Sequence, residues 1–273
     1  MFIDRIYRGW LLTQTSARIL WADKRLLLFT LLSTVCTVLA TAIILAPVYG
    51  AMRSSDHLHS GFPLMRLFIL YMTTSFISVF FNTALVAIVL ERLNGGELGF
   101  EHGLWVAVDN IITILVLAAI SATVGVLLRT IGRQLRFGGL LAVLLFGAAW
   151  EIATFLSVPV IVAEGGDPFS VLGRSIGLVH KVWGEEVSSN IGIGMISGLF
   201  ALPAIVLGLR GFFSADHTQA LACIGIAAVY LALLSLIVAT LNQIVRAAVY
   251  YFAQTGQVPS GFDGATLRNA MSK

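Results

Sequence analysis

The chain has 273 residues, of which 58% are hydrophobic and only 11% are Asp, Glu, Lys or Arg, whereas soluble domains average about 45–50% and about 25%. A mean hydropathy of +0.92 excludes an ordinary soluble domain and indicates an integral membrane protein. The formal net charge of +3 comes from basic residues scattered around the ends of apolar segments, so it reflects membrane topology rather than nucleic-acid binding.

The first segment in chain order is amphipathic. From Ile3 to Trp21 apolar residues recur at helical spacing, while Asp4 and Arg8 lie on the opposite side. A helix of this kind, with Trp and Arg residues, is typical of the lipid headgroup layer. No small-residue cleavage pattern follows a short apolar core, so we expect no cleavable signal. The first hydrophobic segment should therefore remain as a membrane helix.

Apolar runs long enough to cross a bilayer follow, because about 20 helical residues suffice. Six such runs lie near residues 26–49, 67–90, 104–128, 139–162, 191–209 and 219–245. The predicted fold class is all-α, a polytopic membrane helical bundle of six transmembrane helices arranged as three hairpins. Cys36 and Cys223 have no metal-type spacing and are interpreted as small apolar residues within spans.

Glycine-rich turns follow the even-numbered spans. "GGELGFEHGL" begins at Gly95, "GGDPFSVL" at Gly165 and "TGQVPSGFDGATL" at Thr255. Because any helix end attracts Gly and Pro, ordinary helix termination is one explanation. The accompanying acid and phenylalanine favour the other explanation, an internal repeat.

The residues after the first two turns are amphipathic. The segment around residues 100–111 is shorter and could continue into the third span, whereas apolar residues over 169–183 alternate by three and four. Asp167 is predicted to cap the second of these helices, and Pro168 fits its first turn. We therefore predict one integral membrane domain in which interfacial helices precede spans one, three and five. It covers residues 1–273, with pseudo-repeats at about 1–94, 95–164 and 165–255 and a short tail, 256–273.

The distribution of basic residues predicts the orientation. If the N-terminus is cytoplasmic, six of the 17 Lys and Arg residues lie outside and the other eleven inside, as the positive-inside rule favours. Both termini are therefore expected in the cytoplasm. Three arginines between spans three and four count against this orientation. The outside set is Arg53, Arg66, Arg129, Arg133, Arg136 and Arg210.

Tryptophan positions give a second indication, because Trp prefers the interface between membrane and water. Four of the five Trp residues precede spans one, three and five, and only Trp150 lies within a span. We expect these four to be interfacial anchors on the cytoplasmic side. They are Trp10, Trp21, Trp105 and Trp183.

Polar residues inside the apolar runs are the candidates for function, because ionisable groups in a bilayer are costly. Glu151 lies near the middle of span four and must be paired or protonated there, and Pro159 should kink or end the helix beyond it. We predict a polar intramembrane cluster, which either forms part of a proton- or ion-coupled pathway or fixes helix register by hydrogen bonds. Its members are Asn82, Glu151, Asn242 and Arg246.

Metal binding and catalysis have little support. His57, His59 and His217 fall in predicted outer loops near acidic residues, and they are weak metal candidates because exposed loop histidines are usually solvated. There is no HExxH sequence and no glycine loop following a strand. We predict no metal, no cofactor and no catalytic residue, and the chain is not expected to be an enzyme.

Longer stretches resemble a known family. "WEIATFLSVPVIVAEGGDP" from Trp150, "VLGRSIGLVHKVWG" from Val171 and "AAVYYFAQTGQVPSGFD" from Ala247 resemble a broad six-span family of unknown function in prokaryotes. "GWLLTQTSARILWADKRLLLF" from Gly9 looks like that family's opening. The family is distantly similar to the membrane portion of some bacterial glycerophosphodiester phosphodiesterases.

The resemblance implies architecture rather than activity. It implies six spans with surface helices before spans three and five, but this chain has no room for the phosphodiesterases' soluble catalytic barrel. Glu151 departs from the usually apolar neighbour of the family's tryptophan, so a mechanism based on Glu151 need not be shared by the family.

Two functions are expected from these patterns. The first is a non-enzymatic component of a bacterial inner membrane that binds lipids through its surface helices, and that could also bind a protein partner or a second copy of itself. The alternative is a small transporter or channel that uses the region of Glu151 and Arg246. Nucleic acid is not an expected partner.

Overall fold

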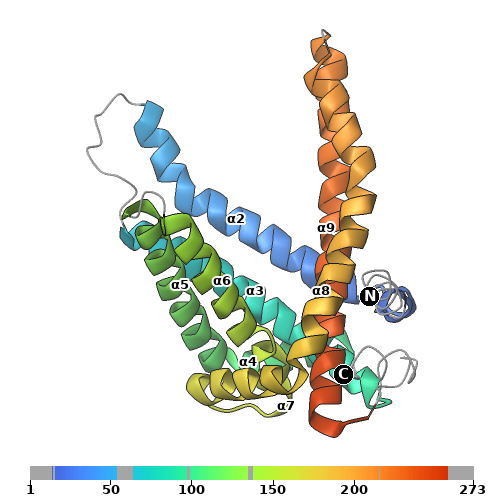
Figure 1. Cartoon of the computed structure of the whole chain (residues 1–273). Coiled ribbons are helices and arrows are strands. Elements are labelled where there is room, and N and C mark those ends of the chain that lie inside the picture. Colours follow the sequence, from blue (N-terminus) through green and yellow to red (C-terminus); the bar gives the residue numbers. More distant parts are fainter. Residues whose placement is uncertain are drawn as a thin grey trace. The chain divides into compact units, whose positions relative to one another are not determined.

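A computed structural model gives the architecture (Figure 1) and describes residues 14, 16–53, 64–96, 99–134, 138–214 and 216–257. Side chains at 48–53, 133, 138–139, 142 and 182–196 are outside this description. Within the described residues every regular element is a helix and there is no strand, which confirms the all-α prediction. Residues 16–22 are helical, and the longer helices are α2 (Leu26–Arg53), α3 (Leu64–Leu93), α4 (Phe100–Asp109), α5 (Ile111–Gln134), α6 (Gly138–Thr154), α7 (Ser157–Ala163), α8 (Pro168–Phe212) and α9 (His217–Thr255).

The chain divides into two compact units. The first, here called the discontinuous unit, combines Met1–Leu28 with Val182–Lys273, and the second, the continuous unit, is Phe29–Lys181. The boundaries between the units fall within α2 and α8, which each contribute residues to both. The three pseudo-repeats remain a prediction.

Five stretches in the described residues are long and apolar enough to cross a membrane. They are Leu26–Pro47, Leu64–Leu93, Ile111–Gly132, Val143–Ala163 and His217–Thr255. The sixth predicted span, 191–209, falls within α8, where the described apolar stretch is the shorter Ser197–Phe212. The structure therefore has several helices compatible with a membrane protein, and the six-span arrangement remains a prediction.

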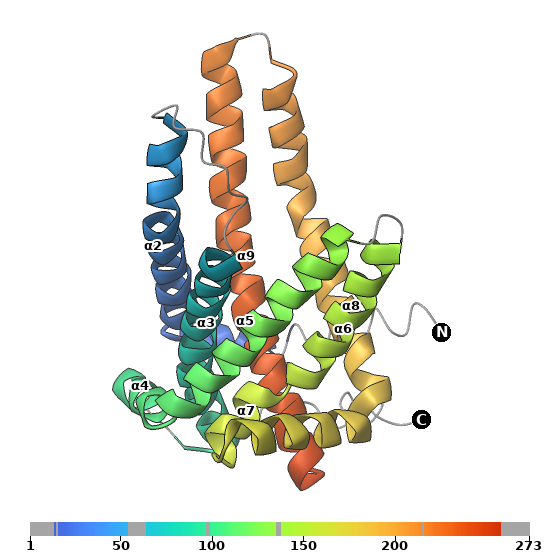
Figure 2. The same ribbon diagram turned by 90° about the vertical axis from the view of Figure 1, so that its left-hand side faces the viewer.

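Helix α3 forms the centre of the continuous unit and packs against α4, α5 and α7, while α5 also packs against α6 (Figure 2). Its residues Thr83 to Leu90 are all buried, so every face of this part of the helix is covered. An apolar helix that is covered all round is the expected behaviour of a core element. The core of this unit therefore lies around the second half of α3.

Helix α4 is separate from α5, although the sequence left open that they form one helix. The break is at Asn110, whose side-chain amide donates to the carbonyl of Val106 at 2.9 Å. Phe100 stacks on Phe29 with ring centroids 4.4 Å apart. Gly103 approaches α3 so closely that a Cβ there would lie 2.6 Å from the carbonyl oxygen of Ala84. Two specific contacts therefore hold α4 on α2 and α3.

The fourth predicted span is broken into α6 and α7, as Pro159 predicted. Pro159 lacks an N–H, and its ring would clash with the carbonyl four residues earlier, that of Phe155. The freed groups find other partners. The backbone N–H of Leu156 donates to the hydroxyl of Ser175 in α8 at 3.2 Å, and the hydroxyl of Ser157 donates to the carbonyl of Thr154 at 2.6 Å. The N–H of Leu156 and the carbonyl of Thr154 thus both have side-chain partners at the break.

The glycine turns predicted after even-numbered spans are confirmed at three helix ends. Gly95, Gly165 and Gly256 have φ of 87°, 64° and 67°, in the left-handed region that glycine adopts readily. After α3 the N–H of Gly96 donates to Glu91 and that of Gly95 to Arg92, the Schellman pattern, whereas Gly165 and Gly256 make the simpler bond to the fourth residue back. All three helices therefore end at a left-handed glycine whose N–H bonds back into the last turn.

Helices α8 and α9 form a hairpin in the discontinuous unit. The hydroxyl of Tyr230 donates to the carbonyl of Phe200 at 2.9 Å, and a Cβ at Gly211 would lie 3.0 Å from Cβ of Cys223. Asp216 caps α9 by accepting from the N–H of Thr218 at 2.9 Å. The hairpin is therefore joined by a close glycine contact, a polar contact and a side-chain cap.

Candidate functional site

The predicted polar cluster is divided between the two units. Asn82 and Glu151 belong to the continuous unit, and Asn242 and Arg246 to the discontinuous unit. Asn82 donates its side-chain amide to the hydroxyl of Ser78 at 3.3 Å. Glu151 is exposed on α6, and no described residue donates to its carboxylate. The cluster as a whole remains a prediction.

In the discontinuous unit, Asn242 and Arg246 are half-buried in α9. Gln243 between them is 8% exposed, and within the described part of the chain its Oε1 accepts no hydrogen bond. This part of α9 therefore places three polar side chains among buried apolar residues.

The continuous unit contains an open pocket that the sequence reasoning missed. Its volume is ≈ 480 Å³, and α2, α3 and α5 line it with hydroxyl side chains and two valines. The lining residues are Ser33, Thr34, Thr37, Val38, Thr74, Ser75, Ser78, Val79 and Ser121. We call this the hydroxyl pocket.

Each helix contributes to the hydroxyl pocket from the middle of its apolar stretch. Residues 33–38 lie midway along Leu26–Pro47, residues 74–79 midway along Leu64–Leu93, and Ser121 midway along Ile111–Gly132. Asn82 extends the polar surface by one helical turn, because it is bonded to Ser78 in the pocket wall. The pocket and Asn82 form one continuous polar strip.

The signal for this pocket was present in the sequence as three runs of small polar residues, "STVCT" from Ser33, "TTSFIS" from Thr73 and "SAT" from Ser121. Ser and Thr in apolar helices usually bond to their own backbone, as Thr34 and Thr74 do to the carbonyls of Thr30 and Leu70 at 2.8 Å. Ser and Thr in an apolar helix are therefore easily interpreted as residues without a functional role. Only the structure reveals that the three runs line one open space.

A second pocket of the continuous unit is apolar. It has a volume of ≈ 390 Å³ between α5 and α6 and includes Trp150. The other lining residues are Val124, Leu127, Leu128, Ile131, Phe146, Ala149 and Ala153. Trp150 thus packs beside an apolar groove within the fourth predicted span.

The predicted anchors Trp21 and Trp105 have exposed indole rings, at 69% and 64%. Trp105 lies on α4, whose opposite face carries the buried Gly103 and Ala107. The ammonium of Lys24 lies 5.7 Å from the ring centroid of Trp21, within reach of a cation–π contact. Trp10 and the side chain of Trp183 lie outside the described residues.

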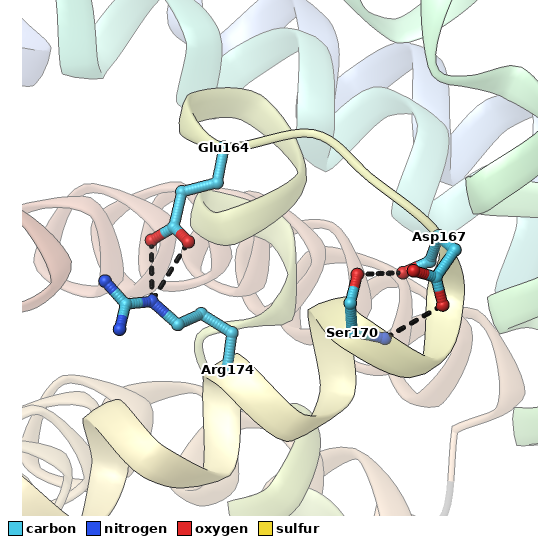
Figure 3. A network of polar contacts seen from close by, with 4 residues as sticks. All are labelled: Glu164, Asp167, Ser170 and Arg174. Atoms are coloured by element: carbon cyan, nitrogen blue, oxygen red, sulfur yellow. Dashed lines mark hydrogen bonds and ion pairs between the residues drawn. The ribbon is translucent and has the colours of Figure 1, made fainter.

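The start of α8 confirms the predicted cap (Figure 3). The carboxylate of Asp167 accepts from the backbone N–H groups of Ser170 at 3.1 Å and Phe169 at 3.2 Å, and the Ser170 hydroxyl donates to the Asp167 carbonyl. These bonds, chiefly those from Ser170, hold the pKa of Asp167 below its usual 3.8. The charged form of Asp167 is therefore the one that begins the helix.

The same turn carries an ion pair. Arg174 donates its Nε to both carboxylate oxygens of Glu164, at 2.9 and 3.0 Å (Figure 3). The pair bridges the glycine turn, because Glu164 precedes it and Arg174 lies in α8. In addition, the Thr113 hydroxyl of α5 donates to the carbonyl of Gly166 at 2.9 Å. The Glu164–Arg174 ion pair thus links the two ends of the turn, and Thr113 of α5 bonds to its middle.

Described side chains at the start of α8 divide among three faces. Val171, Ser175 and Leu178 are buried, Phe169 and Ile176 are exposed and apolar, and Arg174, with Lys181 one heptad later, is exposed and basic. The start of α8 therefore has a buried face, an exposed apolar face and an exposed basic face.

Of the weak metal candidates, His57 and His59 lie outside the described residues. His217 is the exposed first residue of α9. In the part of the chain that the structure describes, no three His, Cys, Asp or Glu side chains gather as a metal would need.

Comparison with known proteins gives one relationship. A model of a family of unknown function (DUF6159) matches residues 62–262, which is more than half of the chain. No curated protein and no solved structure matches the chain. The expected likeness to phosphodiesterase membrane portions has no support from these comparisons.

Proposed function

The chain belongs to the family of unknown function DUF6159, and from that premise we propose that it is a non-enzymatic component of a bacterial inner membrane that binds membrane lipids through its surface helices. It crosses the membrane six times, and both termini are cytoplasmic. Helix α4 and the first part of α8 lie in the cytoplasmic headgroup layer.

The observation that carries this proposal is the exposure of large apolar side chains on α4 and at the start of α8. Trp105 on α4 is 64% exposed and Phe169 on α8 is 72% exposed. Each has charged neighbours on its own helix, Glu101 for Trp105 and Arg174 for Phe169. Apolar side chains beside charges suit the boundary between acyl chains and headgroups.

Quenching by brominated lipids tests the proposal. In a variant whose only tryptophan is Trp105, the others being replaced by Phe, lipids brominated near the headgroup should quench fluorescence more strongly than lipids brominated near the bilayer centre. A matched variant that retains only Trp150 should show the opposite preference, since Trp150 lies inside a span. If Trp105 is quenched by neither lipid, α4 is not a lipid-contacting helix.

A second candidate function is a small transporter or channel. The hydroxyl pocket favours it, because hydrogen-bonding groups midway along three apolar helices are what a polar solute would need. In a transporter of this kind, Glu151 and Arg246 would be the groups that couple movement of the solute to movement of protons or ions.

A flux assay separates the two functions. Proteoliposomes that contain a pH-sensitive dye should show a protein-dependent proton flux under a solute gradient, and Glu151→Gln should abolish it. If Glu151→Gln leaves both folding and every flux unchanged, the coupled pathway is excluded. If the wild-type protein carries no flux, the lipid-binding role is favoured.

A further inference from the structure

We infer that the hydroxyl pocket is a binding site for a small neutral molecule that carries hydroxyl groups. The inference rests on the proposed membrane location, because a bilayer would withdraw these groups from bulk water. It goes beyond the surface role, which uses α4 and α8 and leaves the pocket unexplained.

The number of hydroxyl groups is the first argument. Seven of the nine lining residues are Ser or Thr. Backbone bonds account for Thr34 and Thr74, and Ser78 accepts from Asn82. Within the residues that the structure describes, the remaining four hydroxyls have no hydrogen-bond partner; they belong to Ser33, Thr37, Ser75 and Ser121. Polar groups that are out of water require partners, and a ligand with hydroxyls would supply them.

The position of the pocket is the second argument. Three helices each place hydroxyls at the middle of an apolar stretch. One Ser or Thr in a membrane helix needs no special explanation, since it bonds to the preceding turn. Here three helices line one open space of ≈ 480 Å³. This volume is within the range of small-molecule binding sites, about 300–1,000 Å³.

The charge of the lining selects the ligand class. None of the nine lining residues is ionisable, so a charged ligand would lose its hydration without gaining a counter-charge. Each hydroxyl both donates and accepts, which matches the hydroxyl groups of a polyol. A neutral polyol is therefore favoured over an anion or a cation.

Cysteine reactivity tests the inference in the full chain. Thr37→Cys and, as a second variant, Ser75→Cys are made in a Cys36→Ala, Cys223→Ala background and reconstituted into phosphatidylcholine vesicles. The control is Leu39→Cys, two residues from Thr37 and therefore about 200° around α2. The reagent is hydroxyethyl methanethiosulfonate, which is neutral and reacts with the thiolate, and glycerol and glycerol 3-phosphate are the competitors.

Both pocket cysteines should react about tenfold faster than Leu39→Cys, because a thiol ionises poorly in apolar surroundings. Glycerol should slow them, and glycerol 3-phosphate should not. If all three cysteines react slowly, or if glycerol gives no protection, or if glycerol 3-phosphate protects equally, the inference is overturned while the membrane location stands. If Leu39→Cys reacts as fast as a cysteine in water, α2 is not in lipid, and the proposed function fails too.

Discussion

Asp167 holds the first turn of α8 through its ionised carboxylate. Two backbone N–H groups donate to it, and they lower its pKa below 3.8. Because the pKa of Asp167 is lower in the folded protein than in the unfolded chain, its carboxylate stabilises the fold at any pH above the unfolded-state pKa. This stabilisation disappears as the pH falls through the folded-state pKa. The cap should therefore weaken only in acid, below pH 3.8.

The first prediction concerns this cap. Asp167→Ala should lower the midpoint of thermal unfolding at pH 7, and Asp167→Asn should retain only part of the stability, because Asn also caps helices but carries no charge. Circular dichroism of the purified protein in detergent measures both. The difference between wild type and Asp167→Ala should shrink at pH 3. An equal difference at the two pH values would show that the charge of Asp167 is unimportant.

Gly103 matters because of space rather than conformation. A Cβ there would meet the Ala84 carbonyl at 2.6 Å and the Ile88 side chain at 3.0 Å. Neither the α3 backbone nor the buried Ile88 can move far, so α4 must shift away from α3.

We expect Gly103→Ala to destabilise the protein by about 1–3 kcal/mol, the usual cost of overpacking. Gly173→Ala is the matched control, because it is also a glycine within a helix but its Cβ would meet nothing within 4 Å. The control should be neutral or stabilising by up to about 1 kcal/mol, through helix propensity. Chemical unfolding in mixed micelles compares the two. Equal effects would mean that α4 is not tightly docked.

At the scale of elements, the break between α6 and α7 depends on a third helix. The N–H of Leu156 is released by the break, and Ser175 of α8 accepts it in a fully buried position. Ser175→Ala should leave this N–H without a partner and cost about 1–3 kcal/mol. Ser235→Ala, where an exposed hydroxyl bonds within its own helix, should stay within about 0.5 kcal/mol.

Amide hydrogen exchange gives a second measurement for Ser175→Ala. Exchange should increase at residues 155–158 and remain unchanged in α9. Uniform acceleration over the whole chain, or no change at Leu156, would contradict the assigned role of Ser175.

The elements differ in how far sequence predicts them. The glycine turns, the Pro159 break and the Asp167 cap were predicted because each depends on residues within a few positions of one another. Whether α4 is separate from α5 was left open, since Asn110 is only a weak helix breaker. The hydroxyl pocket was missed because residues of three helices, α2, α3 and α5, line it together, and Ser and Thr alone do not reveal this.

At the scale of the molecule, the polar cluster and the three hairpins remain predictions, and the residues proposed for the cluster belong to both units. Apolar periodicity gives the length of each helix, but it contains no information about which helices pack together. For this reason Glu151 could be identified as unusual while its exposure on α6 could not.

The predicted orientation of the whole chain in the membrane can be tested by labelling cysteines from each side. In a background without native cysteines, Lys181→Cys should be labelled by an impermeant maleimide only from the cytoplasmic side, and His217→Cys only from the other side. Both positions are exposed: His217 begins the apolar stretch His217–Thr255, and Lys181 lies in α8 ahead of that helix's apolar stretch, Ser197–Phe212. Labelling in right-side-out and inverted vesicles measures this. Lys181→Cys labelled from outside would reverse the topology and exclude a cytoplasmic position for the start of α8.

The division into a continuous and a discontinuous unit has a consequence for biogenesis. Synthesis proceeds from the N-terminus, so all of Phe29–Lys181 exists before Val182–Lys273 is made. At 5–20 residues per second the remaining segment takes roughly 5–20 s. Throughout that interval residues 1–28 must wait for the rest of their own unit, while the continuous unit has every residue it needs. Ribosome-bound chains should therefore acquire protease resistance in 29–181 first.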